Sequence, residues 1–235
     1  MRNVMRYTQM TAVRLTMMAL ATLAVSRADI IQETVELPPA SGAYDFGAGV
    51  CVALVNRCTE NPIVFGFNVT QRQEVSGNEV VDTTATYSAD IFTNNSGVPG
   101  VFLGHLIMAG TAQFTYTGRN PAVQPLGPWP TELSAFDFQG TLGGNTLGVK
   151  KDPTKASTGI TDISFNSAGP PVTYKVSSSL EIFSLFSFNG GPFMEAPPRT
   201  AGLIPSPQAV PEPASGVLAG ILLAGVAGIA SRRRL

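Results

Sequence analysis

The chain of 235 residues is 44% hydrophobic and only 13% charged, with 24 glycines, 18 prolines, two cysteines and one histidine. This apolar content excludes wholesale disorder, and the glycine and proline residues do not follow the strict repeat of a collagen. Seven of the 15 Lys and Arg residues lie in the two terminal segments. The rest of the chain is therefore acidic, which excludes an electrostatic nucleic-acid binder.

The first 28 residues have the pattern of an export signal. Arg2, Arg6 and Arg14 precede an uncharged run, Leu15–Val25, which is too short to span a bilayer as a helix. Small residues follow at Ser26 and Ala28. The pattern predicts a signal peptide over residues 1–28, cleaved after Ala28, and hence a protein that crosses the inner membrane.

Residues 29–195 are predicted to form one all-β domain, a single antiparallel β-sandwich-like fold. Apolar and polar residues alternate with period two in five segments: 63–70, 87–91, 112–116, 172–176 and 180–188. Turn-forming Gly, Asn and Pro residues separate them at 94–97, 143–145 and 169–171. About ten short strands joined by turns are typical of a sandwich.

The two cysteines, Cys51 and Cys58, are separated by six residues. In an exported protein two cysteines this close most simply form a disulfide, and closing so short a loop stabilises the fold by about 2.5 kcal/mol. The alternative, half of a metal site, lacks partner ligands because the chain has a single histidine. The sequence therefore predicts a local disulfide, with no metal and no cofactor.

The carboxyl-terminal segment has three parts. Residues 196–210 contain four prolines and are predicted to form a Pro-rich stalk. Pro211, Glu212 and Pro213 follow, and then an uncharged run of 17 residues, 214–230, which is just long enough for a transmembrane helix. The cluster Arg232, Arg233 and Arg234 closes the chain, and the positive-inside rule places it on the cytoplasmic side, with the domain outside.

This order of motif, helix and arginine cluster, in about residues 210–235, resembles the PEP-CTERM sorting signal, the tag on exosortase substrates in Gram-negative bacteria. The resemblance implies that the tail is held transiently in the inner membrane and is removed near the motif by the exosortase, a membrane cysteine protease. Pro211, Glu212 and Pro213 would then be recognition residues in a substrate rather than an active site. The body would pass to the cell surface or extracellular matrix, often in species that make exopolysaccharide. The alternative for the tail is a plain single-pass anchor.

The body contains no nucleophile elbow, phosphate-binding loop or zinc-binding helix motif. His105 lies in an apolar run, where a packed or strand-end residue is the expected role rather than a catalytic base. Trp129, with Tyr116 nearby, could offer a sugar-stacking platform or anchor a loop against the core. Seven acids could supply the carboxylate pair of a glycoside hydrolase, although no spacing singles out two of them: Asp45, Glu60, Glu74, Asp82, Asp90, Asp137 and Asp162.

We therefore expect an exported, non-catalytic domain that serves as a structural module or binds exopolysaccharide or other surface proteins. The alternative is a secreted carbohydrate-active hydrolase that uses a carboxylate pair. Such an enzyme should show two acids about 5–10 Å apart in a cleft, at least one of them with a raised pKa.

Overall fold

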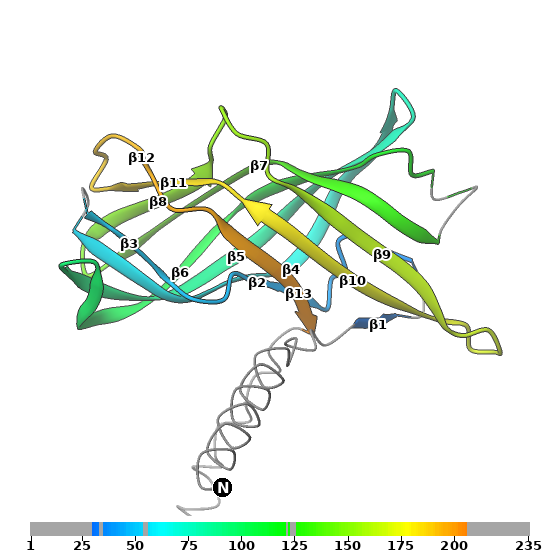
Figure 1. The fold of residues 1–235 in the computed structure, drawn as a ribbon, viewed down its shortest axis with the longest axis horizontal. Helices are drawn as coiled ribbons and strands as arrows, with labels where there is room; N and C mark the ends of the chain where they lie inside the picture. The colour runs from blue at the N-terminus through cyan, green and yellow to red at the C-terminus, as the bar shows by residue number, and fades with distance from the viewer. Residues whose placement is uncertain (1–29, 33–34, 54–55, 121, 123–125, 206–235) are drawn as a thin grey trace, which may run out of the picture.

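The computed structural model describes residues 30–32, 35–53, 56–120, 122 and 126–205 (Figure 1). These residues form thirteen β-strands and no α-helix. The strands are β1 Ile30–Gln32, β2 Gly42–Asp45, β3 Val50–Val52, β4 Arg57–Val75, β5 Asn78–Asn95, β6 Val98–Tyr116, β7 Gly127–Leu142, β8 Asn145–Lys151, β9 Thr158–Ser167, β10 Thr173–Ile182, β11 Ser184–Phe188, β12 Met194–Glu195 and β13 Arg199–Pro205. Within the described ranges, no helix is long and apolar enough to cross a membrane.

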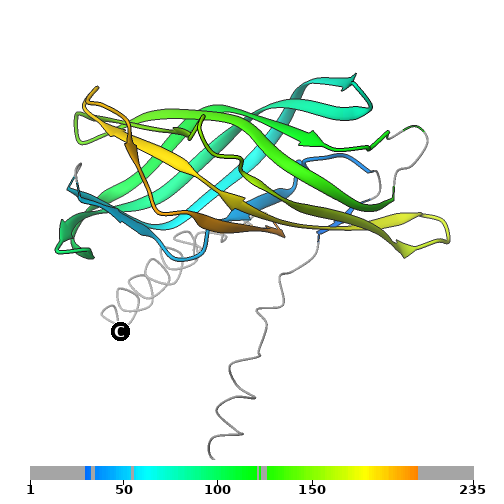
Figure 2. The ribbon, with the colours of Figure 1, turned by 45° about the horizontal axis from the view of Figure 1, so that its top comes forward.

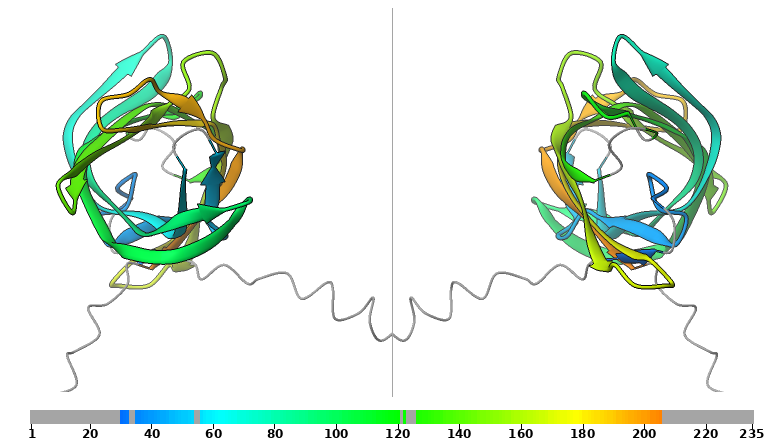
Figure 3. Two further views of the ribbon diagram at one scale, coloured as in Figure 1. Left: turned by 90° about the vertical axis from the view of Figure 1, so that its left-hand side faces the viewer. Right: turned by 90° about the vertical axis from the view of Figure 1, so that its right-hand side faces the viewer.

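Eight of the strands form a closed antiparallel ring. From β10 the pairing runs through β13, β2, β4, β5, β6 and β7, and β9 pairs with both β7 and β10. Ile163 of β9 shows the closure, because it lies opposite Val176 of β10 and also opposite Gly127 of β7. Figures 2 and 3 show the long, inclined strands and their closed outline. A ring of eight strands encloses an interior just wide enough to be filled by side chains or to hold one small ligand.

The other five strands extend the ring at its margins. β8 pairs with β7, and β11 and β12 continue from β8. β3 pairs with the start of β4, and β1 pairs with β10.

Three connections between neighbouring strands are tight two-residue turns. Ser76 and Gly77 join β4 to β5 with φ of 53° and 77°, and Ser96 and Gly97 join β5 to β6 with φ of 54° and 89°. Gly143 and Gly144 do the same between β7 and β8. A pair of positive φ values matches the twist of the flanking strands, which is why glycine stands at these positions.

The prediction of an all-β, antiparallel domain is confirmed, and its turns at 94–97, 143–145 and 169–171 do separate strands. The strands belong to one continuous sheet, so opposite walls of the ring take the place of the two layers of a sandwich. The expected strand over 180–188 is divided at Phe183, whose N–H donates to Ser157 Oγ and whose carbonyl accepts from Asp152 N–H. These bonds let β11 leave β10 and pair with β8.

The prediction of a stalk over residues 196–210 is wrong up to Pro205. Arg199–Pro205 is strand β13, which pairs with β10 on one side and β2 on the other. Its Ala201 and Leu203 are fully buried, so this segment belongs to the core of the domain. The predicted signal peptide, residues 206–210 of the stalk and the whole sorting tail lie outside the described residues.

Candidate functional site

The interior of the ring contains an apolar cavity. Most of its lining side chains are aliphatic or aromatic: Phe46, Val50, Pro62, Val64, Phe67, Ala112, Phe114, Leu133, Phe136, Phe138, Val149, Leu180, Ile182 and Phe186. About 620 Å³ of this space is not filled by atoms, a value that includes some open solvent, so the enclosed free space is smaller. Its size and its lining fit a small apolar molecule.

Four residues bring polar atoms to this lining: Tyr44, Tyr87, Ser184 and Arg199. The hydroxyl of Tyr44 donates to Ser178 Oγ at 3.2 Å, and that of Tyr87 is hydrogen-bonded to Thr59. Arg199, the first residue of β13, donates through Nη2 to the carbonyl of Gly49. Its Nε is buried and has no hydrogen-bond partner among the described residues. The cavity wall therefore carries one cation with a donor to spare.

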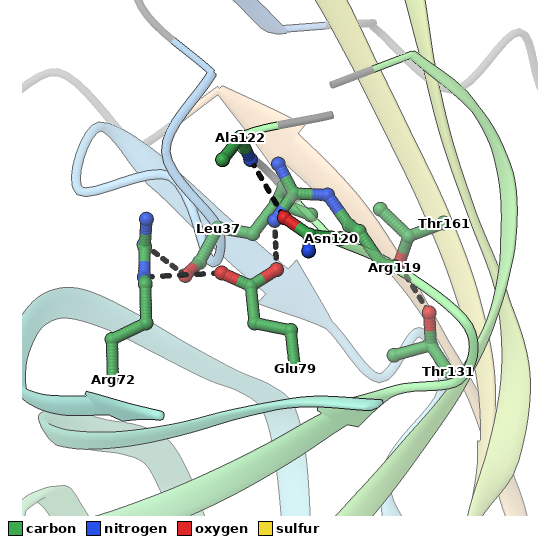
Figure 4. Close-up of polar contacts among 8 residues, drawn as sticks. All are labelled: Leu37, Arg72, Glu79, Arg119, Asn120, Ala122, Thr131 and Thr161. Carbon is green, nitrogen blue, oxygen red and sulfur yellow. Dashed lines mark hydrogen bonds and ion pairs between the residues drawn. The ribbon is translucent and has the colours of Figure 1, made fainter. Parts of the chain in front are cut away.

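The opposite end of the interior is closed by a buried ionic cluster, which we call the plug: Arg72, Glu79 and Arg119 (Figure 4). Glu79, near the start of β5, forms an ion pair with Arg119, and its other oxygen lies 3.1 Å from Arg72 Nε. The side chains of Glu79 and Arg119 are 2% and 0% exposed, whereas that of Arg72 is 31% exposed. Arg72 also donates to the carbonyl of Leu37 at 3.1 Å, which ties the chain before β2 to the plug.

The plug places two positive charges around one negative charge. Burial lowers the pKa of Arg119 to about 10, and the positive charge of Arg72 adds to the effect. The neighbouring carboxylate of Glu79 favours the charged form of the guanidinium, so Arg119 is a cation at neutral pH. Such a cluster depends on each member, because loss of one partner leaves a buried charge unpaired.

Stacked aromatic rings connect the plug to the cavity. Arg119 lies 6.0 Å from the ring centre of Tyr116, which stacks on Phe114 at 6.3 Å, and Phe114 stacks on Tyr44 at 5.7 Å. Burial raises the pKa of Tyr44 to about 12, and it also raises the pKa of Tyr87 and Tyr116. These three interior tyrosines are therefore neutral at physiological pH. The stacked rings of Tyr44, Phe114 and Tyr116 separate the cavity from the plug.

A line of hydroxyl groups crosses the wall beside these rings. Thr131 of β7 donates to Thr161 of β9 at 2.9 Å, Thr161 is 2.9 Å from Ser178 of β10, and Ser178 accepts from Tyr44 of β2. Each hydroxyl has a partner, so this polar group satisfies itself within the apolar interior. These hydrogen bonds link β9 to the strands on its two sides, β7 and β10, and continue to β2.

The predicted disulfide between Cys51 and Cys58 is present. It joins directly opposed residues of β3 and β4. The strand held in this way carries Val50, which lines the cavity, and follows Gly49, whose carbonyl accepts from Arg199. The disulfide therefore fixes part of the cavity wall next to the free Arg199 donor.

His105 lies on the outer face of the sheet, directly opposite Asp90. Its Nδ1 is 2.9 Å from Asp90 Oδ1, and its Nε2 is 2.9 Å from Ser88 Oγ. The hydrogen bond with His105 lowers the pKa of Asp90, and a second one from Asn61 adds to the effect. Sequence reasoning missed Ser88, because a serine on the neighbouring strand carries no motif.

This order of groups is that of a nucleophile, a base and an orienting acid. However, Ser88 is only 5% exposed, and β5 is paired on both sides at this point, with Ile63 of β4 and Ile107 of β6. The backbone N–H groups around Ser88 are therefore engaged in hydrogen bonds between strands. They are not free to stabilise the oxyanion that forms when a serine attacks a carbonyl. The geometry supports a structural role for His105 on the outer face.

The register brings two of the seven candidate acids together. Glu60 lies directly opposite Asp90 on the outer face, and no other two of the seven lie opposite each other. The lowered pKa of Asp90 is opposite in direction to what a general acid needs. Trp129 is 9% exposed and packs in the core from β7, so it does not form an exposed sugar-stacking platform.

The remaining predicted residues give no second site. The motif Pro211, Glu212 and Pro213, the arginines Arg232 to Arg234 and the cleavage position at Ala28 lie outside the described residues. Within the described part of the chain, no group of three or more His, Cys, Asp and Glu side chains is placed to hold a metal ion.

Sequence reasoning also missed Arg199 and the plug. Arg199 follows two prolines and falls in the predicted stalk, although the apolar run after it, 201–204, is a strand signal. Glu79 and Arg119 are 40 residues apart, so no local pattern links them. No family model, curated protein or solved structure matches the chain.

Proposed function

We propose that this chain is an exported protein with a PEP-CTERM sorting signal, processed by an exosortase and delivered to the cell surface or extracellular matrix. The tripartite tail supports this proposal, and so does the disulfide in the body, since disulfides persist in oxidising compartments. The inner membrane is a transient location in this scheme, with the domain outside and the carboxyl terminus in the cytoplasm.

The sorting proposal is tested by mass spectrometry of the protein recovered from the surface of its host. We expect a carboxyl terminus close to residue 211 in the native protein and retention of the tail in Glu212→Gln. Glu181→Gln, at an exposed position of β10, is the control and should be processed normally. Surface protein that still ends at Leu235 would refute the proposal.

For the folded domain we propose a non-catalytic role, the binding of a small apolar molecule inside the closed sheet. The observation that carries this proposal is the apolar cavity, closed toward one end by stacked rings and the plug. Binding sites of closed sheets are typically interior and largely preformed. The ladder around Ser88 and the lowered pKa of Asp90 also favour a role without catalysis.

The test is binding of 1-octanol to the full chain, measured by native mass spectrometry and calorimetry. Ala112, on the inner face of β6, lines the cavity, so Ala112→Leu should fill it and lower octanol affinity at least tenfold without loss of stability. Ala109→Leu places the same side chain at an exposed position of the same strand and should bind normally. Absence of octanol binding, or equal binding by both variants, would contradict the proposal.

Contact with a surface protein through β6 is the second candidate. Four side chains in the first half of this strand are apolar and exposed: Val101, Phe102, Leu103 and Ile107. Exposed apolar clusters of this kind are typical of protein contacts rather than sugar contacts. Retention of the native protein, but not of Phe102→Ser, on surface extracts of the host would support it; equal retention of both would count against it.

A further inference from the structure

We propose that the molecule bound in the cavity is an anionic amphiphile, whose single apolar chain occupies the interior and whose head group binds Arg199. This inference rests on the proposed function of the cavity and specifies its ligand class. It is drawn from the distribution of polar atoms along the cavity wall.

The first observation is that Arg199 is the single charged residue in the lining of the cavity. No ion pair between described residues includes it. By contrast, the buried Arg119 at the other end of the interior has Glu79 as its partner. A guanidinium stays charged at all physiological pH values, so the cavity wall carries a half-buried cation without a counter-ion among the described residues.

The second observation is the unused donor. Nη2 of Arg199 donates to the carbonyl of Gly49, which holds the side chain in place, while the buried Nε has no partner among the described residues. A buried donor without an acceptor is unfavourable, and a ligand oxygen that accepts from it would remove that cost. An anionic oxygen forms the stronger, charge-assisted bond with a guanidinium.

The third observation excludes competing head groups. The hydroxyls of Tyr44 and Tyr87 already have partners, so a neutral polar head would find few free groups in the wall. No carboxylate lines the cavity, so a cationic head would face Arg199 without a counter-charge. The apolar part must be a single short chain because the free space is small. A single-chain carboxylate or phosphate monoester meets all three conditions.

The experiment compares three ligands of equal chain length: octanoate, octyl phosphate and 1-octanol. With the full chain at pH 7 we expect at least one of the two anions to bind ten times more tightly than octanol, and the tighter anion identifies the head group. In Arg199→Gln, which keeps a planar polar side chain, this preference, measured as the ratio of anion affinity to octanol affinity, should disappear. Arg199→Lys should restore part of it.

The control is Arg57→Gln, which removes an equal charge from an arginine that lies over the Phe188 ring and is not part of the cavity wall. It should retain the preference for the anion. Octanol binding without any preference for the anions, or a preference that survives in Arg199→Gln, would overturn the inference and leave the proposed function intact. Failure of all three ligands to bind would overturn both.

Discussion

The plug makes a quantitative prediction about stability. Glu79 is the single acid between two arginines, and its side chain is 2% exposed. In Glu79→Gln the fully buried Arg119 loses its counter-ion, which costs about 3–5 kcal/mol for a buried pair. The loss at Arg72 should add less than about 1 kcal/mol, because this side chain is 31% exposed and keeps its bond to Leu37. Domains of this kind have total stabilities of about 5–15 kcal/mol, so the change should be easy to detect.

The assay is urea unfolding followed by the fluorescence of Trp129, the one tryptophan of the chain. Glu74→Gln, an exposed acid directly opposite Glu79, is the matched control and should change the free energy of unfolding by less than about 1 kcal/mol. The double variant Glu79→Leu with Arg119→Met should recover most of the loss, because no unpaired charge remains between them. A loss below 1 kcal/mol in Glu79→Gln, or a double variant as unstable as the single one, would refute this account of the plug.

Three further predictions concern pH and the disulfide. Burial raises the pKa of the three interior tyrosines above 10.0, so the unfolded state loses these protons first; urea unfolding should show full stability below about pH 10 and a steady loss as the pH rises toward 12. Stability that stays constant up to pH 12 would contradict this burial. Replacing both cysteines by alanine should lower the free energy of unfolding by about 2.5 kcal/mol in the same assay, and an unchanged value would mean that the wall at β3 needs no crosslink. In His105→Asn the pKa of Asp90 should rise toward 3.8, as followed by carboxyl NMR titration; no rise would show that Asn61 or another contact sets it.

Strands that bury one face could be predicted from the sequence, because their apolar and polar residues alternate. The alternation at 63–70 predicts a strand there, and β4 contains it, but the buried residues are Val64 and Phe67 because the bulge between Phe65 and Asn68 shifts the register. The end of the same strand, 68–75, is exposed, and here β4 pairs with β5 alone because its pairing with β2 covers only residues 63–65. Such residues carry no period-two signal, so the strands are longer than the sequence suggests.

The closure of the sheet and the cavity could not be predicted in this way. Alternation shows which side chains face inward, but β9 closes the ring through pairings with β7 and β10 that no local pattern encodes. Bulges between Glu60 and Ile63 and between Phe65 and Asn68 also shift the register of β4. The disulfide was predictable because seven positions along the chain bring its partners together, whereas Glu79 and Arg119 meet only in the folded sheet.

The ends of the described domain lie at the plugged side of the ring. Ile30 pairs with Val176 near the start of β10, and Pro205 pairs with Gly42, a few residues after the carbonyl that Arg72 holds. Arg199 begins the same strand that ends at Pro205, about 20 Å away at the rise of a strand. The chain therefore enters and leaves the described domain on the side of the plug, and Arg199 with its free donor lies at the far end of the same strand.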